Sequence, residues 1–293
     1  MRRRWLLALA LLLAASSPAA AVVFEDGGSH LVDTDLLGKD GITVRDGPGP
    51  TPTQVTVQAF VEASIGVEDT SSVTVDGGST GGSVFALDDA TLDVVGSDIG
   101  NDIFANHTAE ASAQDVDVFN NVFALGYAVI DLDDVRIGSD LEAGDLFAND
   151  SGHVVAQGGT AVHDNVFTND MAWIELLDVA VGGDVFANGA SRIDVAGGSY
   201  AQEIESNGTA TVRIVGSGFA VDGSPVPFGA LAALSGTLTG QLADGSPLDN
   251  VFARQETATI LLVAVPEAGA AALLLAGAAV LAPAARRARR GLG

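Results

Sequence analysis

The stretch VFALDDATLDVVGSDIGNDIFANHTAEASAQDVDVFNNVFAL, residues 84–125, contains one short pattern three times. An aliphatic residue, a phenylalanine and an alanine are followed by Leu or Asn, and Phe85, Phe104 and Phe123 stand 19 residues apart. Self-similarity at a fixed period of about 20 residues is typical of repeat proteins, in which each unit packs only on its neighbours. This stretch therefore decides the fold.

The pattern continues on both sides of this stretch. Toward the C-terminus it recurs at Phe147, Phe167 and Phe186, at steps of 24, 20 and 19 residues. Weaker copies stand at residues 65–67, 204–207, 226–228 and 251–253. Together these make about ten copies.

A second strand follows each phenylalanine at a fixed offset. Leu92 and Val94 lie seven and nine residues after Phe85 and flank a polar Asp93, and the same alternation recurs in the other copies. Period-two alternation indicates a strand with one buried face, and glycine pairs such as 77–78 and 197–198 turn the chain afterwards. The sequence predicts an all-β fold, a single parallel β-helix or β-solenoid of about ten rungs of 19–24 residues.

The organisation expected from this count has five parts. Residues 1–21 are a signal peptide, 22–64 an N-terminal strand or cap segment, and 65–215 the solenoid repeats. Residues 216–263 are irregular closing rungs or a cap, and 264–293 form a sorting tail. Pro48, Pro50 and Pro52 cannot donate to a ladder, so we expect them to blunt the first open edge.

Two columns of polar residues flank the phenylalanines, and in a solenoid such residues lie about 4.8 Å apart on successive rungs. Asn stacks form hydrogen-bonded ladders and tolerate corner conformations, so both columns are expected to have a structural role. The alternative is that the acidic residues of the first column bind Ca²⁺, although no calcium-binding motif is present. The first column comprises Asp102, Asn121, Asp145, Asn165 and Asp184, with Asp102, Asp145 and Asp184 as the calcium candidates, and the second comprises Asn106, Asn149, Asn169, Asn188 and Asn207.

The phenylalanine column leaves two orientations open. Strict alternation with the preceding aliphatic residue would point each ring outward, and six exposed rings would form a large adhesive patch. We therefore expect a corner that turns both residues inward. If the rings were exposed, they would be a candidate aromatic platform for sugars or for another chain.

The N-terminus predicts export. Arg2, Arg3 and Arg4 precede an apolar run of about eleven residues, too short to cross a membrane, and Ala19 and Ala21 occupy the positions that a signal peptidase reads.

The part of the chain between the two ends is strongly acidic. It contains six basic residues and 37 acidic residues, which gives a net charge of −31. Such a surface repels nucleic acid and attracts divalent cations. No cysteine is present, so disulfides and thiolate metal sites are excluded.

The sequence of the C-terminus predicts a membrane-spanning segment. Val265, Pro266 and Glu267 precede the apolar run AAALLLAGAAVLAPAA, and the chain ends with a basic cluster, Arg286, Arg287, Arg289 and Arg290. A helix over residues 268–285 would be about 27 Å long, close to one hydrocarbon thickness, with the arginines left on the cytoplasmic side. A plain membrane anchor is the simpler alternative.

This order of motif, helix and arginines resembles the PEP-CTERM sorting signal of Gram-negative bacteria, except that Ala268 replaces the usual proline. The segment LTGQLADGSP, residues 238–247, is similar to the endings that precede this signal. The resemblance implies an exosortase-like processing enzyme as partner, transient anchoring by the C-terminal helix, and a final place at the cell surface or in exopolysaccharide.

The interior of the chain predicts no enzyme. Asp133, Asp134, His153 and Arg192 are the residues that a carbohydrate-active β-helix would use, but Asp133 lies ten residues after its phenylalanine and His153 only six. The four histidines lack zinc-ligand spacing, and no nucleotide or nucleophile motif is present. We expect a non-catalytic structural or adhesive surface protein without a cofactor; a polysaccharide lyase or hydrolase and a Ca²⁺-dependent adhesin are the alternatives.

Overall fold

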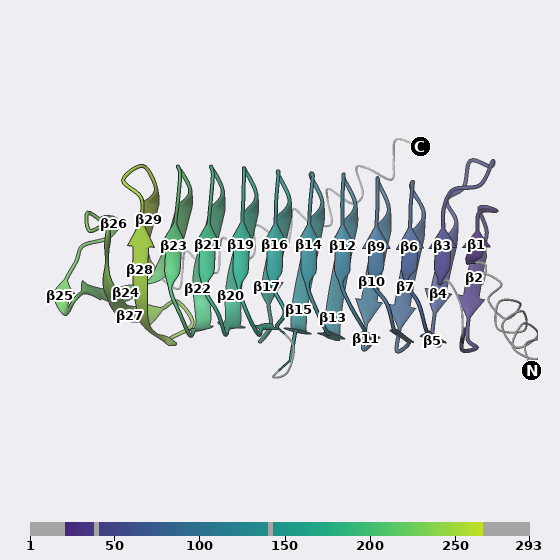
Figure 1. Cartoon of the computed structure of the whole chain (residues 1–293), viewed down its shortest axis with the longest axis horizontal. Coiled ribbons are helices and arrows are strands. Elements are labelled where there is room, and N and C mark those ends of the chain that lie inside the picture. Colours follow the sequence, from purple (N-terminus) through teal and green to yellow (C-terminus); the bar gives the residue numbers. More distant parts are fainter. Residues whose placement is uncertain (1–20, 38–40, 140–142, 266–293) are drawn as a thin grey trace, which may run out of the picture.

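The chain forms an elongated parallel β-solenoid, seen side-on in Figure 1. The computed structural model describes residues 21–37, 41–139 and 143–265, and within them it contains 29 strands and no helix. Successive turns lie side by side along the long axis, from the purple N-terminal end to the yellow-green C-terminal end (Figure 1). The predicted β-solenoid of about ten turns is confirmed.

The repeated Phe pattern forms one row of short parallel strands. Each strand pairs with the equivalent strand of the next turn in identical register, so that Phe85 lies opposite Phe104 and Phe104 opposite Phe123. The row consists of β1 (Val22–Phe24), β3 (Ile42–Val44), β6 (Ile65–Val67), β9 (Val84–Ala86), β12 (Ile103–Ala105), β14 (Val122–Ala124), β16 (Leu146–Ala148), β19 (Val166–Thr168), β21 (Val185–Ala187), β23 (Ile204–Ser206) and β28 (Pro247–Arg254).

The second predicted strand of each repeat forms a second parallel row. It consists of β2 (Ser29–Val32), β4 (Gln54–Val57), β7 (Ser72–Asp76), β10 (Thr91–Val95), β13 (Glu110–Val118), β15 (Val129–Ile137), β17 (His153–Gln157), β20 (Trp173–Val181), β22 (Arg192–Tyr200), β24 (Thr211–Val221) and β29 (Thr259–Ala264). A third, shorter row contains β5 (Phe60–Val61), β8 (Ser79–Thr80), β11 (Asp98–Ile99) and β18 (Ala161–Val162), and the far ends of the nine-residue strands continue it.

The core is a stack of small aliphatic side chains inside the coil. In β10, Leu92 and Val94 are fully buried while Thr91 and Asp93 face outward, as the period-two alternation predicted. The buried residues of successive turns form one continuous cluster. Because each turn buries its apolar face on its neighbours, no single turn needs a core of its own.

Corners are formed by residues in the left-handed region. The corner after the first row places Asp88, His107 and Gly126 of three successive turns at φ of 60°, 59° and 65°. Asp and Gly are among the residues that adopt this conformation most readily. The turn is closed by a backbone hydrogen bond, for example from Ala90 N to Leu87 O at 3.1 Å.

The solenoid begins earlier than the repeat count indicated. β1 pairs with β3 and β3 with β6 in continuous parallel register, so residues 22–64 already form solenoid turns. The three prolines lie between β3 and β4, on the second turn, while β1 and β2 form the turn beneath. The prediction that they blunt the first edge is therefore wrong.

The C-terminal end is closed by antiparallel strands. After β24 the chain leaves the coil through β25 (Ser224–Pro225), β26 (Gly229–Ala230) and β27 (Ser235–Leu242), then returns through β28 and β29. Phe228 is exposed outside the strands, so residues 226–228 are not a rung. In residues 251–253 the register places Phe252 opposite Ile204, so this ring is buried in the core rather than added to the Phe column.

Candidate functional site

The six phenylalanines form a column on the outer face of the first row. Each ring is half-buried and stands between two buried neighbours, so alternation holds and the prediction that a corner turns both residues inward is wrong. Phe123, Phe147, Phe167 and Phe186 stack with centroids 4.9–5.0 Å apart and interplanar angles of 4–8°. The rings of Phe85 and Phe104 are tilted, with centroids 5.9 Å apart.

This stacking explains why an outward aromatic column is tolerated. Each ring in the stacked part covers the faces of its neighbours, and mainly the ring edges are left toward solvent. Aromatic binding of a sugar uses the face of the ring, which here is occupied by another ring. The column therefore stabilises the contact between turns and is poorly suited to be a sugar platform.

Asn149, Asn169, Asn188 and Asn207 form a hydrogen-bonded ladder. The side-chain amide of Asn169 donates to Asn149 Oδ1 at 2.6 Å, that of Asn188 to Asn169 Oδ1 at 3.2 Å, and that of Asn207 to Asn188 Oδ1 at 3.1 Å. Asn106 stands apart, because its Oδ1 accepts the neighbouring His107 N–H at 2.7 Å and leucines occupy this column in the adjacent turns.

The Asp and Asn residues before the Phe strands form a second ladder, of another kind. In each turn a side-chain oxygen accepts the backbone N–H of the equivalent residue one turn on. Asp102 Oδ1 accepts Asn121 N–H at 3.1 Å, and Asp145 Oδ1 accepts Asn165 N–H at 2.8 Å. Asp184 Oδ1 likewise accepts Glu203 N–H at 2.8 Å.

The calcium candidates Asp102, Asp145 and Asp184 thus each hold a backbone N–H of the next turn. Within residues 21–37, 41–139 and 143–265, no group of three or more acidic or histidine side chains is arranged to hold a metal ion. Near this ladder, burial raises the pKa of Asp164, and the carboxylates of Asp145 and Asp184 raise it further. The carboxylates along this edge repel one another.

The most elaborate side-chain cluster lies on the outer face of the second row. The register places His153, Trp173 and Arg192 opposite one another on three successive turns. The His153 ring stacks on Trp173 with centroids 4.4 Å apart and an angle of 9°, and the Arg192 guanidinium lies 4.8 Å from the Trp173 ring centroid on a cation–π contact. We call these residues, with Glu175, Asp194 and Arg213, the Trp173 cluster.

Ion pairs complete the Trp173 cluster. His153 Nε2 lies 3.0 Å from Glu175 Oε1, while Asp194, 4% exposed, receives Arg192 Nε at 2.7 Å and Arg213 Nη1 at 3.2 Å. Hydrogen bonding to Asp194 raises the pKa of Arg192. Two guanidiniums thus compensate one buried carboxylate, which would otherwise be costly to bury.

The predicted enzyme residues are brought together only in part. His153 and Arg192 share a column, as their common offset of six residues from Phe147 and Phe186 indicates, but Trp173 lies between them. Asp133 pairs with Gln157, four positions beyond His153, and Asp134 stands at the next corner with φ of 56°. Sequence reasoning overlooked Trp173, although it has the same six-residue offset from Phe167.

The sorting residues fall mostly outside the described residues. Val265 is exposed and directly follows β29, whereas Pro266, Glu267, Arg286, Arg287, Arg289 and Arg290 lie beyond the described part, as does Ala19. Ala21 directly precedes β1. In the part of the chain that the structure describes, no helix is long and apolar enough to span a bilayer.

The fold places the chain among the parallel β-solenoids. Comparisons with protein-family models, with curated proteins and with solved structures found no match.

Proposed function

We propose that the chain is a non-catalytic structural or adhesive protein of the surface of a Gram-negative cell. The observation that best supports this role is the use of the outer polar and aromatic rows. The Phe column, the Asn ladder and the Asp–Asn ladder each connect equivalent residues of successive turns. Side chains used in this way stiffen a rod and are less available for chemistry.

The proposed route to the surface rests on the two ends of the sequence. Residues 1–21 would direct export, and residues 264–293 would hold the chain in the membrane until an exosortase-like enzyme acts on the motif at Val265, Pro266 and Glu267. Because Val265 directly follows the last strand, the tail would leave the solenoid at its closed end. The acidic rod would then lie outside the membrane, in or near exopolysaccharide.

Two variants test the sorting proposal. Truncation after Val265 keeps β29 complete and removes all but the first two residues of the predicted tail, so the rod should no longer be labelled on intact cells and should appear in a soluble fraction, periplasm or medium. The double variant Pro266→Ala/Glu267→Ala keeps the helix and arginines, so the uncleaved chain should accumulate in the membrane. The exposed Glu256→Ala is the matched control and should behave like the natural chain.

Surface labelling and fractionation of the cells are the measurements. If the natural chain is displayed with its tail uncleaved, the tail acts as a plain anchor and the sorting proposal fails. If the double variant is cleaved and displayed like the natural chain, Pro266 and Glu267 are not the residues that the processing enzyme recognises, and the proposal fails as well. If the truncated chain is still displayed, neither form of tail-dependent attachment is correct.

The enzyme and calcium alternatives receive less support. Asp133 and Asp134 lie away from the column that His153 and Arg192 share, and His153 and Arg192 already contact Trp173, Glu175 and Asp194. The acidic residues suggested for Ca²⁺ each accept a backbone N–H from the next turn. Both alternatives remain open to direct assay for polysaccharide turnover and for a calcium-dependent unfolding midpoint.

A further inference from the structure

Three large side chains of types that are rare in the rod, Tyr127, Met171 and Trp173, lie near one edge of the solenoid, whereas the second tyrosine, Tyr200, is buried at the end of β22. The chain has two Tyr, two Trp and two Met, of which Trp5 and Met1 lie in the predicted signal peptide. Tyr127 and Met171 stand at the corner between the first and second rows and are 70% and 69% exposed, and Trp173 begins the second-row strand after Met171. Other turns have Thr, Ser, Ala or Asp at that corner position. Large exposed side chains at this corner thus depart from the repeat.

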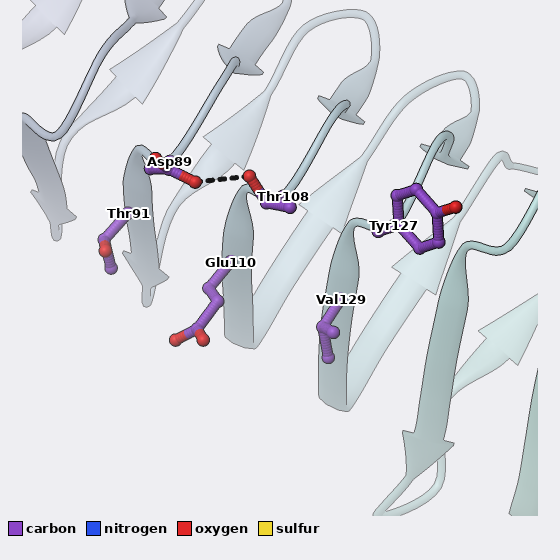
Figure 2. A pocket seen from close by; sticks show the side chains of 6 residues that line it. All are labelled: Asp89, Thr91, Thr108, Glu110, Tyr127 and Val129. Atoms are coloured by element: carbon purple, nitrogen blue, oxygen red, sulfur yellow. Dashed lines mark hydrogen bonds between the residues drawn. The ribbon is translucent and has the colours of Figure 1, made fainter. Parts of the chain in front are cut away.

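A groove lies beside Tyr127. It has a volume of about 530 Å³ and crosses three successive turns, with Tyr127 at one end (Figure 2). We call it the Tyr127 groove. Its lining alternates between corner positions and the first outward position of the following strand: Asp89, Thr91, Thr108, Glu110, Tyr127 and Val129.

Tyr127 is presented differently from the six phenylalanines of the column and from Trp173. The Phe rings and Trp173 have their faces covered by rings or a guanidinium, whereas Tyr127 has no aromatic or cation–π contact among the described residues. Its backbone is held in the ladder, with Tyr127 N–H donating to His107 O at 2.6 Å. A rigid backbone therefore presents an open ring at the groove.

The polar lining offers both kinds of hydrogen-bonding group. Carboxylates of Asp89 and Glu110 accept hydrogen bonds, and the hydroxyls of Thr91 and Thr108 both donate and accept. Thr108 already donates to Asp89 across the turn, which fixes the positions of both side chains (Figure 2). A carboxylate has about four lone-pair positions, so Asp89 can accept further donors.

We propose that the Tyr127 groove binds a neutral, hydroxyl-rich glycan whose chain runs along the solenoid axis. The apolar face of one sugar ring would cover Tyr127, and hydroxyls of the next rings would donate to the carboxylates of Glu110 and Asp89. Successive turns are about 4.8 Å apart, close to the length that one hexose adds to an extended chain. The charge of −31 between the two ends excludes an acidic glycan as the preferred ligand, because like charges repel.

The proposal deepens the surface role and rests on it for where the glycan is encountered. Binding is measured by titration calorimetry of the full chain in detergent with three neutral hexasaccharides, namely cellohexaose, xylohexaose and maltohexaose, and with hexagalacturonate. At least one neutral probe should bind with Kd below about 1 mM. Tyr127→Ala should weaken this binding at least about tenfold, which corresponds to about 1.4 kcal/mol.

Two further variants separate the groove from general effects. Tyr127→Phe keeps the ring face and should stay within about threefold of the natural affinity, a change of no more than about 0.65 kcal/mol. Thr209→Ala changes the same corner position several turns away, outside the groove, and should bind normally. Because Tyr127 is 70% exposed, its substitution should leave the unfolding midpoint unchanged.

Three results would overturn the proposal. The first is that none of the neutral probes binds, and the second is that Tyr127→Ala binds them as tightly as the natural chain does. The third is that hexagalacturonate binds more tightly than every neutral probe. Surface labelling of cells that express Tyr127→Ala separates a failure of the proposed glycan binding from a failure of the proposed surface role. A chain that is displayed but binds no glycan contradicts only the groove, and a chain that binds glycan but is never displayed contradicts only the surface role.

Discussion

Replacing one phenylalanine in the middle of the stacked column should cost more stability than replacing one at its end. Phe147 stacks on Phe123 at 4.9 Å and on Phe167 at 5.0 Å, whereas Phe85 contacts only Phe104, tilted and at 5.9 Å. Both rings are half-buried on equivalent strands. Phe147→Ala and Phe85→Ala therefore remove similar apolar area but two ring contacts against one.

The magnitude follows from the contacts that each variant loses. A ring pair contributes about 0.5–1.5 kcal/mol beyond the area it buries, and the partial burial of one Phe contributes about 1–2 kcal/mol. Phe147→Ala should thus cost about 2–5 kcal/mol and Phe85→Ala about 1.5–3.5 kcal/mol. The two variants should differ by about 0.5–1.5 kcal/mol, the contribution of one ring pair, because their area terms cancel.

Urea unfolding followed by circular dichroism measures this difference. A third variant, Phe147→Leu, keeps apolar bulk but loses both ring contacts, so its midpoint should fall between those of the natural chain and Phe147→Ala. If Phe85→Ala proves as costly as Phe147→Ala, or if Phe147→Leu costs nothing, ring stacking between turns does not stabilise the rod.

Three other predictions concern single polar side chains. Burial by itself would raise the pKa of Asp46, but hydrogen bonds from Thr70 at 2.7 Å and Ser71 at 2.8 Å lower it. Its contribution to stability is present above the unfolded-state pKa and disappears as pH falls through the folded pKa, so Asp46→Asn should lower Tm at pH 7 and much less at about pH 2.5. Asp164 has the opposite sign, because its raised pKa lowers stability as pH rises above the unfolded-state pKa, and the penalty is complete once pH exceeds the folded pKa. Asp164→Asn should therefore raise Tm at pH 7 and leave it unchanged at about pH 3, and an equal gain at both values would contradict the assigned repulsion. Asn169→Ala removes two ladder bonds and should cost about 1–3 kcal/mol in urea unfolding, while Asn106→Ala, which loses one local bond, should cost about 0.5–1.5 kcal/mol; equal costs would argue against the ladder.

The repeat made the fold predictable, because period and alternation are both properties of sequence. Residues 84–125 alone specify the length of a turn and which side chains of β10 are buried. The Asn ladder could equally be predicted from the sequence, since identical residues at identical offsets must stack once the turns are in register.

The orientation of the Phe column could not be predicted from the repeat in the same way. Alternation pointed the rings outward, but the expected cost of exposing them favoured an inward corner. That cost is small because consecutive rings in the stacked part lie nearly parallel and cover one another, a geometry that exists only between turns. The start of the solenoid was also predicted incorrectly. β1 and β2 carry no Phe pattern, but they still pair with the next turn.

The features that depart from the repeat were the hardest to find. Trp173 shares its offset with His153 and Arg192, so alignment of the repeats places it in their column, but the contact between the rings and the guanidinium depends on side-chain conformation in the folded chain. The groove beside Tyr127 depends on side chains from three turns. The repeat period identifies the residues that all turns share, whereas a site of this kind is formed by residues that differ from one turn to the next.

Identical register from one turn to the next also makes the turn a unit of length. A segment such as residues 103–121 begins and ends at the same point of the coil, and its backbone partners on either side are the same kind of strand. Duplicating it within the gene would lengthen the rod by about 4.8 Å without a new core having to be devised. The length of such a rod can thus change by whole turns, through copying alone.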